Sequence, residues 1–238
     1  MTCRGFTLAE VLITLGIIGV VAALTIPTLM QKLDERETVS KLKKFYSTIE
    51  NASKMVNLEY GDYDKWGFTG SNDDIDLFWE RYAKYLNIQQ KTKISEREIN
   101  ENIQTYWLDG TQNSSSRSVI LRFSDGMEVT STWLAASNNS ACLRYSICGD
   151  IKIDINGEKG PNTYGKDIFV FNIKKDGISP DGLDRNGVNA DNKFENYCLR
   201  SVSKQNNGYG CAAWVIYKEN MDYLHCDDLS WNGKTKCD

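Results

Sequence analysis

The sequence predicts an α+β protein in which a long N-terminal helix, able to span a membrane, packs on a small antiparallel β-sheet head. Three observations lead to this prediction. An apolar run extends from Phe6 to Ile26, an amphipathic helical pattern follows it, and strand-like segments separated by Gly- and Asp-rich turns occupy the later part of the chain. Six of the seven cysteines come after residue 140, so we also expect a disulfide-tied C-terminal region.

The apolar run has the length of a membrane span. At about 1.5 Å per residue in a helix, residues 6–26 extend over roughly 31 Å, which matches a bilayer core of about 30 Å. A cleavable secretory signal fits less well, because Arg4 is the only basic residue before the run and no A-x-A motif follows it. The candidate cleavage site is instead the Gly5–Phe6 bond, where cutting would leave the apolar helix on the mature chain.

Glu10 is the single acid in this run. Its position near the helix N-terminus reduces the cost of a carboxylate in lipid, and this alone could account for its presence. Alternatively, Glu10 is present to pair with a cation at the same depth. Cleavage after Gly5 would create one, the α-amino group of Phe6, which could pair with Glu10 of its own helix or of a neighbouring copy.

The segment GFTLAEVLITLGIIGVVAALTIP, residues 5–27, resembles the N-terminus of type IV pilin-like proteins, which include the pilins and the pseudopilins of type II secretion systems. The resemblance implies that a prepilin peptidase cuts after Gly5 and N-methylates Phe6. It also implies that Glu10 is needed for subunit docking and that Pro27 kinks the helix.

The resemblance further implies a location and a set of partners. The chain would be a single-pass protein of the bacterial inner (cytoplasmic) membrane with an extracytoplasmic head, found in a filament or at the cell surface after assembly. Its partners would be copies of itself, related pilin-like subunits, prepilin peptidase, membrane lipid, and an assembly ATPase with its inner-membrane platform. We accordingly expect four parts: a leader peptide at 1–5, a transmembrane half-helix at 6–26, an amphipathic half-helix at 27–60 and a globular α+β head at 61–238.

Beyond Pro27 an apolar stripe predicts that the helix continues and packs on the head. Apolar side chains recur every three or four residues from Val39 to Val56, and we expect the helix to end near residues 59–61. A second helix is expected over 74–86 after an Asp cap. The expected strands are a hairpin of 118–123 and 127–133 with an Asp-Gly turn, followed by 150–155 and 167–173, while 211–217 fits either a strand or a short helix.

The cysteines indicate an oxidising compartment. Removal of residues 1–5 would take Cys3 away and leave an even set of six, as a disulfide framework requires. A structural zinc site is not expected, because no C-x2-C pair occurs and His225 is the only histidine. Sequence neighbours suggest the pairs Cys142–Cys148, Cys198–Cys211 and Cys226–Cys237, although six cysteines permit many other pairings.

Composition disfavours two classes of function. The net charge is −4, the pI is about 5.2 and no basic cluster stands out, so a nucleic-acid partner is not expected. Catalysis has little support, because no G-x-S-x-G, H-E-x-x-H or phosphate-binding glycine loop occurs and any catalytic triad would depend on His225. We therefore expect that the protein is not an enzyme and that it has no catalytic residues.

Calcium is the one cofactor to consider, because two segments are rich in oxygen ligands. Carboxylate and amide side chains at the turn after residue 150 form the first segment: Asp150, Asp154, Asn156 and Glu158. The second segment, DGLDRNGVNAD, offers Asp181, Asp184, Asn186 and Asp191, and some secretion pseudopilins bind calcium in a C-terminal loop. The alternative is that Asp, Asn and Gly are simply the residues of which turns are made.

The sequence therefore favours a structural subunit, a pseudopilin or pilin, that assembles through its N-terminal helix into a membrane-rooted filament of a type II secretion or type IV pilus system. The alternative is a membrane-tethered extracytoplasmic module that binds calcium or a glycan and does not polymerise.

Overall fold

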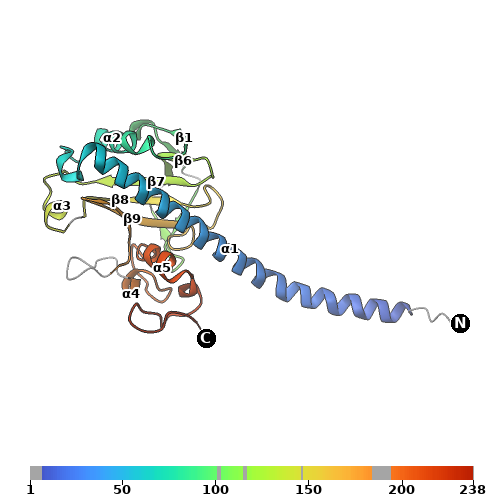
Figure 1. Ribbon diagram of the computed structural model, residues 1–238. Helices are drawn as coiled ribbons and strands as arrows, with labels where there is room; N and C mark the ends of the chain where they lie inside the picture. Colours follow the sequence, from blue (N-terminus) through green and yellow to red (C-terminus); the bar gives the residue numbers. More distant parts are fainter. Residues whose placement is uncertain (1–6, 101–102, 115–116, 146, 184–193, 238) are drawn as a thin grey trace. The chain divides into compact units, whose positions relative to one another are not determined.

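The computed structural model describes residues 7–100, 103–114, 117–145, 147–183 and 194–237 (Figure 1). The chain divides into two compact units, Met1–Glu37 and Thr38–Asp238. Helix α1, Leu8–Tyr60, contributes to both units. The first unit is described below through its part of α1, and the second unit is the head.

The head contains a six-stranded antiparallel sheet in the order β1-β6-β7-β8-β9-β10. Its strands are β1 Ile88–Lys91, β6 Leu121–Phe123, β7 Glu128–Leu134, β8 Gly149–Asp154, β9 Ile168–Lys174 and β10 Gly177–Pro180. Two short ribbons pair β2 Glu98–Asn100 with β5 Arg117–Val119, and β3 Thr105–Tyr106 with β4 Gln112–Asn113. The remaining helices are α2 Asn72–Ala83, α3 Ser140–Tyr145, α4 Phe194–Tyr197 and α5 Cys211–Lys218. Within the described residues, 3-10 turns span Tyr63–Lys65, Ile94–Glu96 and Asp222–Leu224.

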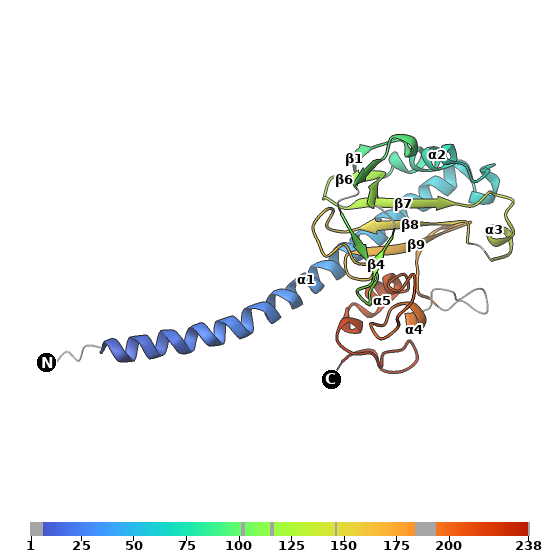
Figure 2. The same ribbon diagram turned by 180° about the vertical axis from the view of Figure 1, so that it is seen from behind.

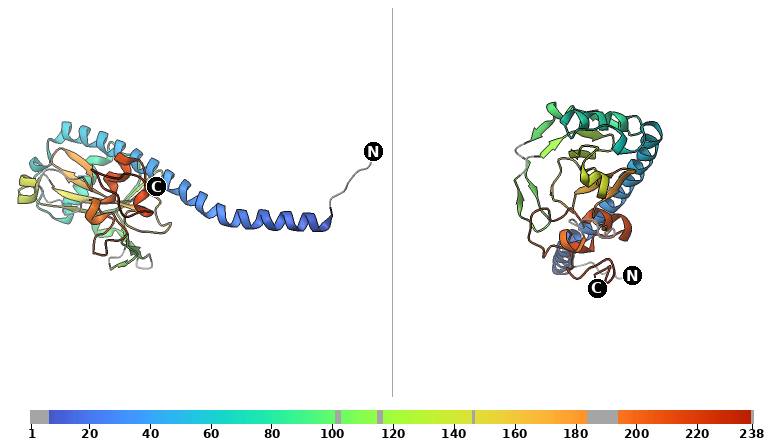
Figure 3. Two further views of the ribbon diagram at one scale, coloured as in Figure 1. Left: turned by 90° about the horizontal axis from the view of Figure 1, so that it is seen from below. Right: turned by 90° about the vertical axis from the view of Figure 1, so that its left-hand side faces the viewer.

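The C-terminal part of α1 and helix α2 lie on one face of this sheet (Figures 1 and 3). The buried side of α1 is the predicted apolar stripe, and it consists of Leu42, Phe45, Ile49, Ala52, Ser53 and Val56. Phe45 packs edge-on against Phe123 of β6 at 5.9 Å and against Phe171 of β9 at 5.1 Å. These contacts join both halves of the sheet to one helix, and removal of this apolar surface from water is the main force that holds the head together.

Helix α1 ends at Tyr60, within the expected range, because Gly61 adopts φ +75 and stops the helical path. Helix α2 differs from the prediction at both ends. Its N-cap is Ser71, and Asp74 lies in the first turn, where its Oδ2 accepts backbone N–H groups of residues 69–71 at 2.7–2.9 Å. The predicted Asp cap was wrong because this acid completes a capping box with Ser71 instead of beginning the helix.

The predicted strand 118–123 is divided in the structure. Its first part belongs to β5, which pairs with β2 through Ile99↔Ser118, and its last part is β6, which pairs with β7 through Leu121↔Val129. The chain changes partners at Ile120, so one apolar run serves two sheets. The other predicted strands agree with β7, β8 and β9, and each boundary lies within one residue of the prediction.

The C-terminal region is joined by three disulfides, Cys142–Cys148, Cys198–Cys211 and Cys226–Cys237. Residues 211–217, left open between strand and helix, form helix α5, in which residues 211–216 are buried. Trp214 of α5 stacks on Phe194 with ring centroids 3.9 Å apart and contacts Trp231 at 5.3 Å. The hydrophobic core of the head thus extends from the sheet to α5 through aromatic packing.

We predict that Phe45→Ala lowers the free energy of unfolding of the head by about 3–5 kcal/mol, because it opens a cavity between α1 and two strands of the sheet. Leu58→Ala, on the same helix but with Leu58 82% exposed, is the matched control and should change the value by less than about 0.5 kcal/mol. Urea denaturation of the full chain in detergent, followed by near-UV circular dichroism, measures both. Equal losses in the two variants would contradict this account of the core.

Candidate functional site: the N-terminal helix and the polar face of the head

Two of the four predicted processing and assembly residues can be placed. Glu10 lies in the first turn of α1 and Pro27 lies inside the helix. Gly5 and Phe6 lie outside the described residues.

Glu10 completes a capping box at the start of α1. The backbone N–H and the hydroxyl of Thr7 both donate to Oε2 of Glu10 at 2.8 Å, and the N–H of Glu10 lies 3.3 Å from the Thr7 hydroxyl oxygen. A Thr-x-x-Glu spacing at a helix start is the sequence signature of this motif, so Thr7 was available to sequence reasoning and was missed. The carboxylate therefore stabilises the helix end and is held at a fixed place on it.

The first part of α1 is apolar on all sides. It is long and apolar enough to cross a membrane, and the most apolar stretch has a mean hydropathy of 2.3 with none of its residues buried within the chain. Leu12, Ile18 and Leu24 are each more than 60% exposed. A helix with no polar side does not suit water, and it needs either lipid or other helices around it.

Two threonine hydroxyls inside this stretch are hydrogen-bonded within the helix. The hydroxyl of Thr14 donates to the carbonyl of Glu10 at 2.9 Å, and that of Thr25 donates to the carbonyl of Val21 at 2.9 Å. Such back-bonding lets Thr enter a hydrocarbon environment. Pro27 carries no N–H and cannot donate the usual helical bond to the carbonyl of Ala23, which weakens the helix at that turn.

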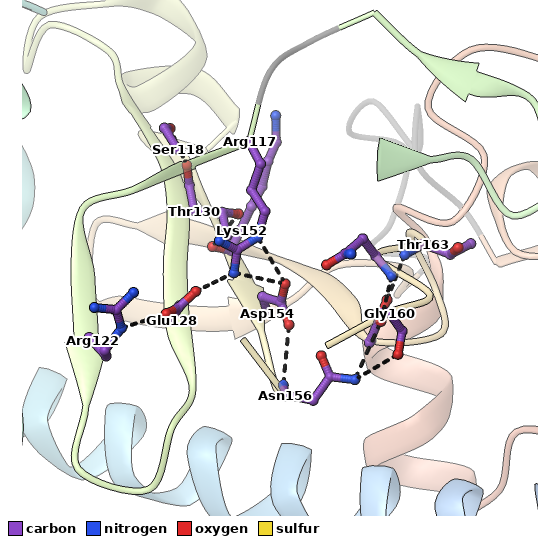
Figure 4. A network of polar contacts seen from close by, with 12 residues as sticks. Arg117, Ser118, Arg122, Glu128, Thr130, Lys152, Asp154, Asn156, Gly160 and Thr163 are labelled. Atoms are coloured by element: carbon purple, nitrogen blue, oxygen red, sulfur yellow. Dashed lines mark hydrogen bonds and ion pairs between the residues drawn. The ribbon is translucent and has the colours of Figure 1, made fainter. Parts of the chain in front are cut away.

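The head presents a polar network on the face of the sheet opposite α1 (Figure 4). The Arg117 side chain is 1% exposed and forms ion pairs with Glu128, and with Asp154 at 3.3 Å between Nη2 and Oδ2. Arg122 joins the network through Nε, 2.6 Å from Oε1 of Glu128. The guanidinium of Arg117 therefore ties β5 to β7 and β8 on this face. Glu128 and Asp154, the two buried acids that Arg117 contacts, thus each have an opposite charge beside them.

Two buried acids on this face, Asp154 and Asp167, have raised pKa values. Burial and the nearby charge of Asp167 raise the pKa of Asp154 to about 7, although Arg117 opposes the shift. Burial also raises the pKa of Asp167 to about 6, against hydrogen bonds donated by the backbone N–H groups of Asn162 and Thr163 at 2.7 and 2.6 Å. Arg117 and Asp167 carry no motif in the sequence, and sequence reasoning did not find this network.

The residues considered for calcium are placed only in part. Asp181 is buried and its Oδ1 accepts the N–H of Gly182 at 2.7 Å, while Asp184, Asn186 and Asp191 lie outside the described residues. Among the residues that the structure describes, no group of three or more His, Cys, Asp or Glu side chains is arranged to hold a metal ion. In the first segment, Asp154 faces Arg117 and Glu158 is exposed.

Comparison with known proteins assigns the chain to a family. A family model described as "Family of unknown function (DUF6613)" matches residues 28–221, most of the chain. The chain belongs to the DUF6613 family. A second model, the prokaryotic N-terminal methylation motif, matches residues 1–26. No solved structure matches the chain.

One curated relative is similar to part of this DUF6613 member. The type II secretion system core protein G of Escherichia coli (strain K12) is 40% identical over 63 residues, which are 25% of this chain and 41% of that protein. The chain thus matches less than half of the relative's length. Together with the methylation motif, this match confirms the predicted resemblance to pilin-like proteins. The motif and the apolar helix together indicate a membrane anchor and an extracytoplasmic head.

We predict that the network makes the stability of the head depend on pH. Because the folded-state pKa values of Asp154 and Asp167 are raised, their contribution is greatest below the unfolded value of about 4 and is lost as the pH rises toward 7. Asp154→Asn should flatten this fall in the free energy of unfolding. Asp176→Asn, at an exposed turn, should leave it unchanged. Urea titrations from pH 4 to pH 8 measure the slope, and an equal slope in Asp154→Asn would refute the assignment.

Proposed function

We propose that this pilin-like protein is a structural subunit, without catalytic activity, that assembles through its N-terminal helix into a membrane-rooted filament of a type II secretion or type IV pilus system. The observation that carries the proposal is Glu10, an acid fixed at the start of a helix that is otherwise apolar on all sides. In the proposed division, residues 1–5 are a leader, 6–26 span the membrane, 27–60 form the amphipathic half-helix and 61–238 form the head.

The geometry of Glu10 supports a docking role. Within the residues that the structure describes, both hydrogen bonds to its carboxylate end on Oε2, which leaves Oε1 for another donor. Cleavage after Gly5 would create an ammonium group on Phe6 at this depth of the bilayer. An ion pair between that group of one copy and Glu10 of the next would neutralise two charges that are costly in lipid, so it would favour lateral assembly over isolated helices.

The proposed partners and location follow from the same helix. Prepilin peptidase would process the Gly5–Phe6 bond and methylate Phe6, and Pro27 would adapt the helix to its neighbours. The protein would lie in the bacterial inner membrane before assembly and in the filament afterwards. In the filament, copies of this chain and related subunits would surround the helix. An assembly ATPase on its inner-membrane platform would drive assembly. The similarity to a core protein of type II secretion supports a secretion system as the setting.

Processing predicts a definite mass. We expect the intact mass of the membrane-extracted protein to lack Met1–Gly5 and to carry one methyl group on Phe6. Gly5→Leu should block cleavage, because the peptidase would need a residue without a side chain at this position. Mass spectrometry of both proteins decides the point. A mature chain that still starts with Met1 would refute filament assembly and would favour a membrane-tethered binding module.

Variants of Glu10 separate capping from docking. Gln at position 10 can still accept the hydrogen bonds of Thr7, but it carries no charge. If the charge pairs with a neighbouring chain, Glu10→Gln and Glu10→Leu should both reduce filament yield at least tenfold while the monomer stays abundant in the membrane. Asp34→Asn, an exposed acid on the same helix, is the control. Normal filament yield in Glu10→Gln, measured after shearing and immunoblotting, would show that the residue acts only as a helix cap.

A further inference from the structure

A row of side chains crosses the sheet on the face opposite α1. The strand register sets Trp133 of β7 opposite Asp150 of β8, and Asp150 opposite Asn172 of β9. Residues in register share a face, and the alternate residues Ile151 and Phe171 belong to the core beneath α1. Trp133, Asp150 and Asn172 therefore point to the other side, and we call them the Trp133 row.

The Trp133 row is the open part of this face. Nearer the opposite end of the strands, Arg117 covers Asp154, and Tyr164 packs with Tyr209 beside Ile168. In Figure 2, the segment that carries β4 lies in front of this end of the sheet, whereas no helix or strand lies in front of the end next to α3. Trp133 is 52% exposed, while the core tryptophans are almost fully buried. An indole left this open on a strand has surface available for a ligand.

Asp150 lacks a complete set of partners. Its Oδ1 is buried and accepts no hydrogen bond, and no ion pair within the described residues includes this carboxylate. Lys152, two residues away on β8, directs its ammonium toward the ring of Tyr209, 5.2 Å from the centroid. Burial raises the pKa of Asp150, although the charge of Lys152 opposes this shift. Burial, and after it the charge of Asp150, raises the pKa of Tyr209. A hydrogen-bond donor that reaches this carboxylate would therefore stabilise it, because it would remove the cost of the unsatisfied buried oxygen.

We propose that the Trp133 row binds an arginine side chain of a partner protein. A guanidinium ion can pair with the carboxylate of Asp150, stack on the exposed indole of Trp133 and donate to the amide oxygen of Asn172 in one pose. A cation suits this position better than a neutral sugar, because the oxygen without a hydrogen-bond partner belongs to a carboxylate and the whole chain carries a net charge of −4. This inference concerns the head alone and does not depend on filament assembly.

The test uses the full chain in detergent, labelled with fluorotryptophan, and N-acetyl-arginine amide as the probe. Of the six tryptophan resonances, the one that disappears in Trp133→Phe reports on the row. We expect the probe to shift this resonance, and Asp150→Asn to weaken the apparent affinity at least tenfold. Asp176→Asn, an exposed acid outside the row, should change the affinity less than twofold.

Two controls show whether a loss of binding comes from the row itself or from damage to the fold. Thermal melts of Asp150→Asn establish that the variant is folded, and calorimetric titration of Trp133→Leu tests the indole at an exposed position where folding is not at stake. The proposal is overturned if the Trp133 resonance does not move, if Asp150→Asn binds the probe as well as the parent chain does, or if methyl glucoside moves the resonance and the arginine probe does not. The last result would assign the row to a glycan.

Discussion

The packing of α1 on the sheet is the interaction on which the head depends. Phe45 lies between Phe123 and Phe171, so one side chain joins strands from both halves of the sheet to the helix. Helix α1 has two parts that differ in the pattern of their apolar residues. From Leu42 onward its apolar residues form a stripe that the head buries, whereas its first part is apolar on all sides and has no protein surface over it. One helix thus has a part suited to the protein interior on one side and a part suited to lipid on all sides.

Both ends of α1 leave backbone groups without partners inside the helix, and the two ends lie in different environments. At Tyr60 the helix stops at a glycine with positive φ, in the head. At its start, four backbone N–H groups would face hydrocarbon, where water cannot satisfy them. The Thr7–Glu10 capping box answers part of this need. The charge of Glu10 is costly in lipid, but its hydrogen bonds with Thr7 stabilise the start of the helix. Capping uses Oε2 of this carboxylate, so Oε1 can serve docking.

The face of the sheet opposite α1 is built on another principle. Here ion pairs of Arg117 with Glu128 and Asp154 lie beside a small cluster of aromatic and aliphatic side chains. Buried ion pairs of this kind add little stability compared with apolar residues of the same size. Loss of one partner is nevertheless strongly destabilising, because it leaves a buried charge unpaired. We interpret the network as the element that fixes β5 against β7 and β8, while the Trp133 row remains open for recognition.

The sequence by itself determined the elements whose signals are local: the apolar run, the stripe from Val39 to Val56, the Asp125–Gly126 hairpin and the methylation motif. Periodicity and turn chemistry depend only on residues close together in the chain, so they can be read directly. Tertiary structure alone decided the division of residues 118–123 between two sheets, the helical state of residues 211–217, and the meeting of Arg117 with Glu128 and Asp154. Each of these depends on partners distant in sequence, and the free energy of such a contact exists only after the chain has folded.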